Sequence, residues 1–171
     1  LVVMTVALLH TPAHAVMLIG PGQTSIMFSF NDWEDRLEAT PDAIKLAGPG
    51  VTGNGGMGRN VDLDLSEHAD DRFDLTVTPL DGNRTRIVKA VLVDADGTQG
   101  VWHFVLPSDA PDRPVTLEPQ DGRPLSQPLN NNYQPGTTPG LDLANIVQWQ
   151  IHGDWQGQPL AVRITGLTVG D

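Results

Sequence analysis

The chain contains no cysteine and few aromatic residues, and each shortage limits what the protein can do. Without cysteine it forms neither a disulfide framework nor a thiolate site for catalysis or metal binding. Aromatic residues make up only 5% of the 171 residues, which favours at most a sparse aromatic lining for any binding cleft. Basic residues are also scarce. Ten Lys and Arg against 21 Asp and Glu give a net charge of −11, which disfavours nucleic acid and anionic membrane surfaces as partners.

Long hydrophobic runs are missing apart from the first residues. Leu1–Leu9 is almost wholly apolar, and Ala13-His14-Ala15 follows as a small-x-small cleavage pattern, although no basic residue precedes the run. This order predicts a secretory signal peptide over residues 1–15 and a single exported domain over residues 16–171, located outside the cell, at its surface or in a periplasm. A buried first strand and a membrane anchor are the alternatives. The run is shorter than the roughly 20 apolar residues of a membrane-spanning helix.

Period-two alternation is the main structural signal in the rest of the chain. It is clearest in Ile146–His152, where Val147, Trp149 and Ile151 alternate with polar residues, as in a strand with one buried face. Leu160–Val169 alternates in the same way after a polar turn at Gly153–Gly157, and Gly166 interrupts it as a bulge would. Trp102 shares its phase with Phe104 and Leu106. The alternation therefore places Trp102 and Trp149 in the core.

Several shorter segments complete the expected set of strands. Further strands are expected at Ser25–Phe30, Asn60–Leu65, Phe73–Thr78, Arg86–Val93, Gly100–Leu106 and, as an edge strand, Val115–Leu117. Asp94–Thr98 is typical of a hairpin turn. We expect a loop at Gly48–Gly58 and a short helix or irregular link at Glu38–Leu46. Together with 18 glycines and 14 prolines, these segments predict an all-β fold, an antiparallel two-sheet β-sandwich.

Motifs for catalysis and cofactor binding lack their required context. Gly53–Gly58 matches G-x-G-x-x-G, but a strand pattern follows where a dinucleotide site needs a helix. Asp94-x-Asp96-Gly97 resembles the start of an EF-hand loop without its later ligands, so a hairpin turn is the better interpretation. No G-x-S-x-G nucleophile motif is present. The sequence therefore predicts a protein without catalytic residues.

Three aromatic residues lie in polar turns rather than in strands: Trp33, Trp155 and Tyr133. An exposed ring in a loop can stack on the apolar face of a sugar. The alternative is that each ring folds back onto the edge of the sandwich, and the sequence does not separate the two.

An ordered series of segments resembles a known family. The segments are Leu80–Asn83, Val91–Thr98, Trp102–Phe104, Gly140–Ile146 and Gln150–Asp154. The series is similar to the galactose-binding-like jelly-roll domains of secreted bacterial proteins, whose relatives include carbohydrate-binding modules. The resemblance covers residues 25–171. It implies a jelly roll whose strand face or loop ends bind glycans, and a structural calcium ion near the two chain ends, where Asp32, Glu34 and Asp171 are the matching carboxylates.

The open strand face of such a jelly roll carries a polar set in this chain: Lys89, His103, Gln148, Gln150 and His152. We expect a secreted, non-catalytic module that binds a neutral glycan on this face, with Trp155, Tyr133 or Trp33 stacking at the rim. One alternative is an exported structural or surface-interaction protein without a small ligand. A glycoside hydrolase or lyase is the third hypothesis, for which the sequence shows no site.

The implied calcium ion gives a first prediction. An ion bridging Asp32 or Glu34 to Asp171 would bind the native state only, so calcium at 100 times its dissociation constant adds about 2.7 kcal/mol to the free energy of unfolding. Thermal melts with added calcium should then show a higher Tm than melts with a chelator. A Tm that responds to neither would remove the calcium site, and magnesium at the same ionic strength is the control.

Overall fold

The computed structural model describes residues 14–108, 112–130 and 140–170. The first thirteen residues of the predicted signal peptide, Tyr133 and Asp171 lie outside the described residues. Among the residues described, no helix is long and apolar enough to cross a membrane.

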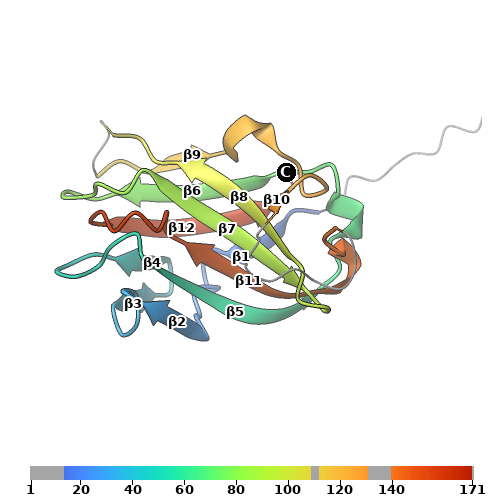
Figure 1. Ribbon diagram of the computed structural model, residues 1–171, viewed down its shortest axis with the longest axis horizontal. Coiled ribbons are helices and arrows are strands. Elements are labelled where there is room, and N and C mark those ends of the chain that lie inside the picture. The colour runs from blue at the N-terminus through green and yellow to red at the C-terminus, as the bar shows by residue number, and fades with distance from the viewer. Residues whose placement is uncertain (1–13, 109–111, 131–139, 171) are drawn as a thin grey trace, which may run out of the picture.

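The described residues form two six-stranded antiparallel sheets that face each other as a sandwich (Figure 1). The back sheet runs in the order β3 (Leu37–Thr40), β4 (Ala43–Leu46), β12 (Val162–Val169), β6 (Phe73–Pro79) and β9 (Val115–Leu117), with β1 (Val16–Ile19) also paired to β12. The front sheet runs β10 (Leu129–Asn130), β8 (Gln99–Val105), β7 (Ile87–Asp94), β11 (Ile146–His152), β5 (Gly55–Leu63) and β2 (Phe28–Asn31). Three short 3-10 turns lie between strands: η1 (Ser66–His68), η2 (Gln120–Gly122) and η3 (Leu143–Asn145). This is the two-sheet architecture of a jelly roll.

Most of the strands expected from the sequence are confirmed. β11 has the predicted bounds, β7 and β8 form the hairpin around Asp94–Thr98, and β9 lies at a sheet edge. The register between β12 and β6 shifts between Ile164 and Gly166, which confirms the bulge. β11 and β12 belong to different sheets, so the Gly153–Gly157 turn carries the chain from the front sheet to the back sheet and closes no hairpin.

The expected helix or irregular link at Glu38–Leu46 is wrong, because this segment is the β3–β4 hairpin. Its four register pairs run from Leu37 opposite Leu46 to Thr40 opposite Ala43. Ile44 and Leu46 are fully buried and alternate with a partly exposed lysine. Their contribution to the core outweighs the weak local signal for a helix.

The expected loop at Gly48–Gly58 is wrong in its second half, where β5 begins at Gly55. The glycines serve close packing here rather than a turn. A Cβ atom on Gly55 would collide with the indole of Trp33, and one on Gly58 would lie 2.6 Å from the Phe28 ring and 2.5 Å from the carbonyl oxygen of Trp149. Glycine in a strand often marks such an approach.

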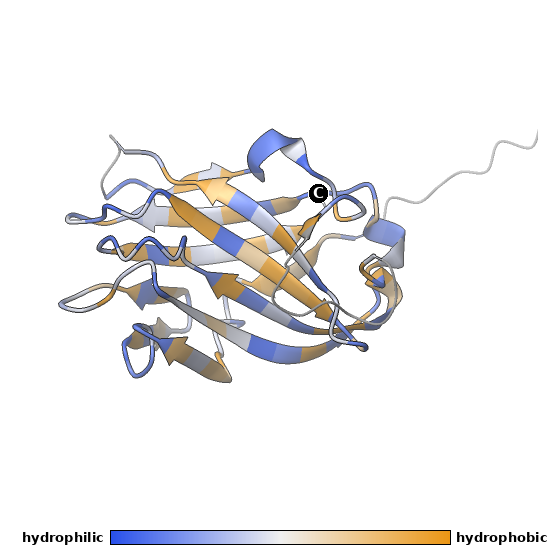
Figure 2. Ribbon diagram, viewed as in Figure 1, coloured by the Kyte–Doolittle hydropathy of each residue, from blue (hydrophilic) through white to orange (hydrophobic). Residues whose placement is uncertain are grey.

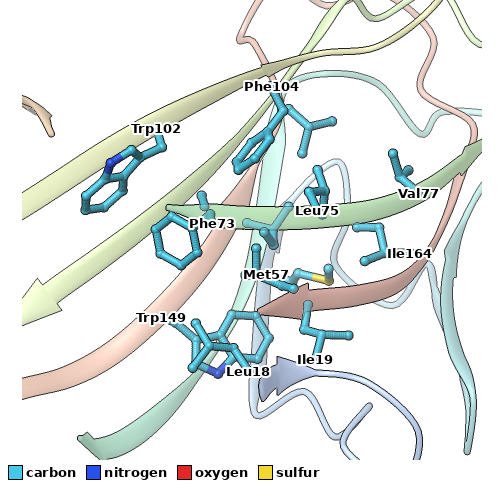
Figure 3. Close-up of a cluster of buried hydrophobic side chains, with 14 of the residues drawn as sticks. Leu18, Ile19, Met57, Phe73, Leu75, Val77, Trp102, Phe104, Trp149 and Ile164 are labelled. Carbon is cyan, nitrogen blue, oxygen red and sulfur yellow. The ribbon is translucent and has the colours of Figure 1, made fainter. Parts of the chain in front are cut away.

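The core lies between the sheets and confirms the predicted positions of two tryptophans. Trp102 and Trp149 are buried, with 0% and 2% of their surface exposed, and the Trp102 ring meets Phe73 edge-on at 4.9 Å between centroids. Figure 3 shows both rings inside a cluster contributed by both sheets. Figure 2 shows hydrophilic and hydrophobic residues alternating along the front strands, as a sheet with one buried face requires.

Val147 departs from the alternation, and the predicted burial of this residue is wrong. The register of β11 shifts between Ile146 and Gln148 against both β5 and β7, which is a β-bulge. Ile146 is therefore fully buried, while 40% of Val147 is exposed. The bulge shifts the alternation of inward and outward side chains by one residue, so Ile146 and Trp149 both face inward and Val147 faces outward.

These assignments predict different costs for two truncations in the same strand. Trp149→Ala should lower the free energy of unfolding by roughly 3–5 kcal/mol, the usual range for a large buried aromatic residue. Val147→Ala should cost under about 1 kcal/mol, because an exposed side chain has little transfer energy to lose. Denaturant unfolding of both variants measures the difference. Equal costs would contradict the bulge.

Candidate binding face

The outer surface of the front sheet carries polar side chains along its central strand, β11. Because Trp149 and Ile151 point into the core, Gln148, Gln150 and His152 point outward. Their register partners on β7 and β5 set the neighbours on either side. His152 lies between Lys89 and Gly56, and Lys89 in turn pairs with His103 on β8. We call this surface the polar face, defined by Lys89, His103, Gln148, Gln150 and His152.

The side chains along β11 form a continuous chain of hydrogen bonds. His152 Nε2 lies 2.5 Å from Gln150 Oε1, the Gln150 amide donates to Gln148 Oε1, and Gln148 Nε2 donates to Asn60 Oδ1 at 2.8 Å. An amide oxygen only accepts, so the proton of His152 is on Nε2. Each glutamine keeps a second N–H and a second lone pair for a ligand. The chain thus holds the amides in fixed orientations and presents both donors and acceptors.

The two imidazoles of the polar face are neutral at pH 7. Burial lowers the pKa of His152 to about 4, and the nearby charge of Lys89 acts in the same direction. Burial also lowers the pKa of His103, as do the charges of Lys89 and Arg123. The pKa of Lys89 is lowered by its own burial, against the opposing effect of the Asp154 carboxylate.

Three aromatic rings continue the polar face beyond His152, and we call them the aromatic row: Phe28, Phe30 and Trp155. The planes of Phe28 and Phe30 are within 16° of parallel at a centroid distance of 6.5 Å, and those of Phe30 and Trp155 within 14° at 6.4 Å. His152 meets Phe30 edge-on at 5.4 Å and Trp155 edge-on at 5.8 Å. The aromatic row and the hydrogen-bonded amides therefore join at His152.

Two glycines in β5 leave the space that the rings of Phe28 and Phe30 occupy. Phe28 pairs with Gly58 and Phe30 with Gly56, so both rings reach across β5 from the edge strand. A Cβ atom on either glycine would collide with the ring beside it. Within the described residues, neither phenylalanine belongs to a hydrophobic core cluster. The rings rest on the outer surface of the sheet.

Trp155 has a strained backbone that hydrogen bonds of the surrounding turn fix in place. Its φ of 63° lies in the left-handed region, which is uncommon for a residue other than glycine. Its N–H donates to the Gly53 carbonyl at 3.0 Å, and the Asp154 carboxylate accepts from the Gln156 N–H at 3.0 Å. With 37% of its surface exposed, the indole is held beside Phe30 and remains open to solvent. Such strain is found most often at functional sites.

The structure separates the residues that the sequence nominated. It brings Lys89, His103 and the three β11 residues together, with Trp155 at one end. Trp33 is excluded as a stacking platform, because it is fully buried and its Nε1 donates to the Thr52 carbonyl at 2.7 Å. For Trp33 the folded-back alternative therefore holds. Tyr133 lies outside the described residues.

Two of the carboxylates nominated for calcium lie in one turn after β2. The half-buried Asp32 accepts a hydrogen bond of 2.5 Å from the Thr52 hydroxyl, and Glu34 is exposed. The third carboxylate, Asp171, lies outside the described residues. Across the described ranges, no three His, Asp or Glu residues are grouped as metal ligands. Calcium binding stays a prediction.

Sequence reasoning did not include Phe28 and Phe30 among the candidate site residues. A signal was present, because these phenylalanines alternate in one strand as Gly56 and Gly58 alternate in another. Only the pairing of β2 with β5 connects the two patterns, and their separation in the chain hides that pairing.

Neither a known family model nor a curated protein sequence matches this chain. Among solved structures, the agarase AgWH50C is similar over 92% of the chain, with a TM-score of 0.57 and 12% identity. The chain spans about a quarter of the length of that agarase, 24%. Two structures of family 11 carbohydrate-binding modules are also similar. One is CtCBM11, with a TM-score of 0.48 and 14% identity. The other is the module of the Clostridium thermocellum cellulase Lic26A-Cel5E, with a TM-score of 0.44 and 15% identity. In both comparisons the similarity covers 95% of this chain and 91% of the module. The two antiparallel sheets and their strand order confirm the predicted jelly-roll sandwich, and the likeness to the agarase extends over most of the chain.

The buried, neutral state of His152 predicts a dependence of stability on pH. Because its pKa falls from about 6.5 in the unfolded chain to about 4 in the fold, its stabilising effect is complete above pH 6.5 and is lost as the pH falls through 4. The loss amounts to about 3 kcal/mol at most. His152→Gln should reduce the difference between denaturant unfolding at pH 7 and at pH 4. An equal difference in wild type and variant would contradict the assignment.

Proposed function

We propose that this chain is a non-catalytic carbohydrate-binding module whose ligand lies across the polar face and the aromatic row. One observation carries the proposal. The hydrogen-bonded chain Asn60–Gln148–Gln150–His152 meets a row of near-parallel rings at His152, on the outer surface of the sheet. Structural likeness at 12% identity concerns the fold alone, so the proposal depends on this chemistry.

The amide chain suits the hydroxyl groups of a sugar. A hydroxyl both donates and accepts, and so do the free N–H groups and lone pairs of Gln148 and Gln150. Since each amide is already oriented by a neighbour, binding orders few additional side chains. Because these amides are already oriented, they can fix the orientation of a bound sugar and distinguish sugars by the positions of their hydroxyl groups.

The aromatic row suits the apolar face of a pyranose ring. Trp155 is the most accessible of the three rings, and its position beside His152 allows one sugar to contact an indole and an imidazole together. Only three rings are available, and hydroxyl desolvation offsets much of each hydrogen bond. We therefore expect micromolar to millimolar affinity, about −8 to −4 kcal/mol.

Binding without catalysis fits the groups that the face presents. Hydrolysis of a glycosidic bond uses two carboxyl groups on either side of the bond. The polar face instead offers amides, neutral imidazoles and one lysine, and the neighbouring Asp154 carboxylate accepts a backbone hydrogen bond. We further propose that residues 1–15 direct export, which would place the module where polysaccharides are found.

Affinity electrophoresis in gels that contain soluble polysaccharides tests the proposal. Trp155→Ala and Gln150→Ala should each weaken retention about tenfold or more, because each removes a principal contact with a sugar. Gln23→Ala is the matched control, since Gln23 is an exposed amide in the turn after β1. Thermal melts establish that the variants are folded.

The outcomes separate the hypotheses. Retention that both variants keep would place the ligand elsewhere on the molecule. Wild-type protein that is retained by no polysaccharide would contradict the glycan hypothesis and favour an exported surface-interaction protein.

A further inference from the structure

The polar face contains a lysine without an ionic partner. The chain has two lysines, and they differ sharply. Lys45 on the back sheet pairs with Glu38 at 3.3 Å. Lys89, which is partly buried at the centre of the polar face, forms no salt bridge or hydrogen bond with any of the described residues. The nearest influence is the Asp154 carboxylate, which favours the charged state of Lys89 from beyond ion-pair distance.

The strand neighbours of Lys89 carry no negative charge, and only the more distant Asp154 carboxylate opposes its charge. His152 pairs with it in the register on one side and His103 on the other. Both imidazoles are neutral at pH 7, because burial and the charge of Lys89 lower their pKa values, so they add no further positive charge beside the ammonium. A partly buried cation between neutral rings is less well solvated than one on an open surface. An anion placed here would gain more than one at an exposed lysine.

A second cation, Arg123, lies near His103. The η2 turn packs against β8 and brings Arg123 close enough for its charge to affect the His103 imidazole. Nη1 of Arg123 donates to the Gln127 carbonyl at 3.3 Å, while its Nε is buried without a hydrogen-bond partner.

Two cations beside one imidazole are conspicuous in a chain with only ten basic residues and a net charge of −11. Such a chain repels polyanions over most of its surface, so it has no general affinity for them. A preference for an anionic ligand would therefore have to come from this local site. The neutral His103 can add an N–H donor beside the two charges.

We propose that the polar face binds a glycan with an anionic substituent, a carboxylate or a sulfate ester, held by Lys89 and Arg123 beside His103. The aromatic row holds a neighbouring sugar of the same chain. This inference rests on the proposed function, and it revises the expectation that the glycan is neutral.

Matched pairs of polysaccharides test the inference by affinity electrophoresis. Polygalacturonate against its methyl ester tests the carboxylate, and carrageenan against agarose tests the sulfate ester on a galactan. Wild-type protein should bind the charged member of at least one pair about tenfold or more tightly, as charge-assisted hydrogen bonds are the stronger kind. Added salt should reduce this preference and leave binding to the neutral member unchanged.

Two variants and two matched controls locate the anion. Lys89→Met keeps an unbranched side chain but removes the ammonium group, so it should reduce the preference to near parity, while Lys45→Met should keep it. Arg123→Gln should reduce the preference as well, with Arg163→Gln, an exposed arginine on the back sheet, as its control. If Arg123→Gln does not fold, Lys89→Met decides.

The outcomes distinguish this inference from the proposed function. Equal binding to both members of each pair, weakened by Trp155→Ala, would overturn the anionic ligand and leave the glycan site standing. A charged preference that Lys89→Met and Arg123→Gln both keep would overturn the location. The absence of binding to every polysaccharide would overturn both proposals.

Discussion

The antiparallel register of β11 at the centre of the front sheet is the constraint on which both the core and the candidate site depend. Pairing with β5 and β7 on its two sides fixes which residues face inward, so the same register buries Trp149 and aligns Gln150 and His152 on the outside. A slip of one residue would exchange the two sets. The core therefore stabilises the polar face indirectly, because burial of Trp149 favours the register that places the amide side chains on the outer surface.

Close packing at glycine extends this face into an aromatic surface. Gly56 and Gly58 leave room for Phe30 and Phe28 to cross β5, and rings packed on strand glycines compensate for the missing side chains. The strained backbone of Trp155 then adds a third ring at the point where the chain leaves for the back sheet. The aromatic row is thus assembled from an edge strand and a connection, both anchored on the central strands.

Local charge and overall charge lead to different expectations for the ligand. The net charge of −11 describes how the whole chain acts at a distance, and screening limits this effect to about 8 Å at physiological ionic strength. Contact energies at the polar face depend instead on Lys89, on the nearby Arg123 and on the neutral histidines next to Lys89. Partial burial strengthens these local electrostatic interactions, because the effective dielectric constant is lower than in water.

The sequence by itself determined most of the strands, the sandwich and the outward set on β11, because period-two alternation is a local property of the chain. It placed Trp149 inside and Gln150 and His152 outside without any knowledge of their neighbours. Tertiary structure decided the rest. The bulge that exposes Val147, the burial of Trp33 and the contact of Phe30 with Gly56 all depend on which strands pair and in which register. These pairings join residues far apart in the chain, so no local pattern encodes them.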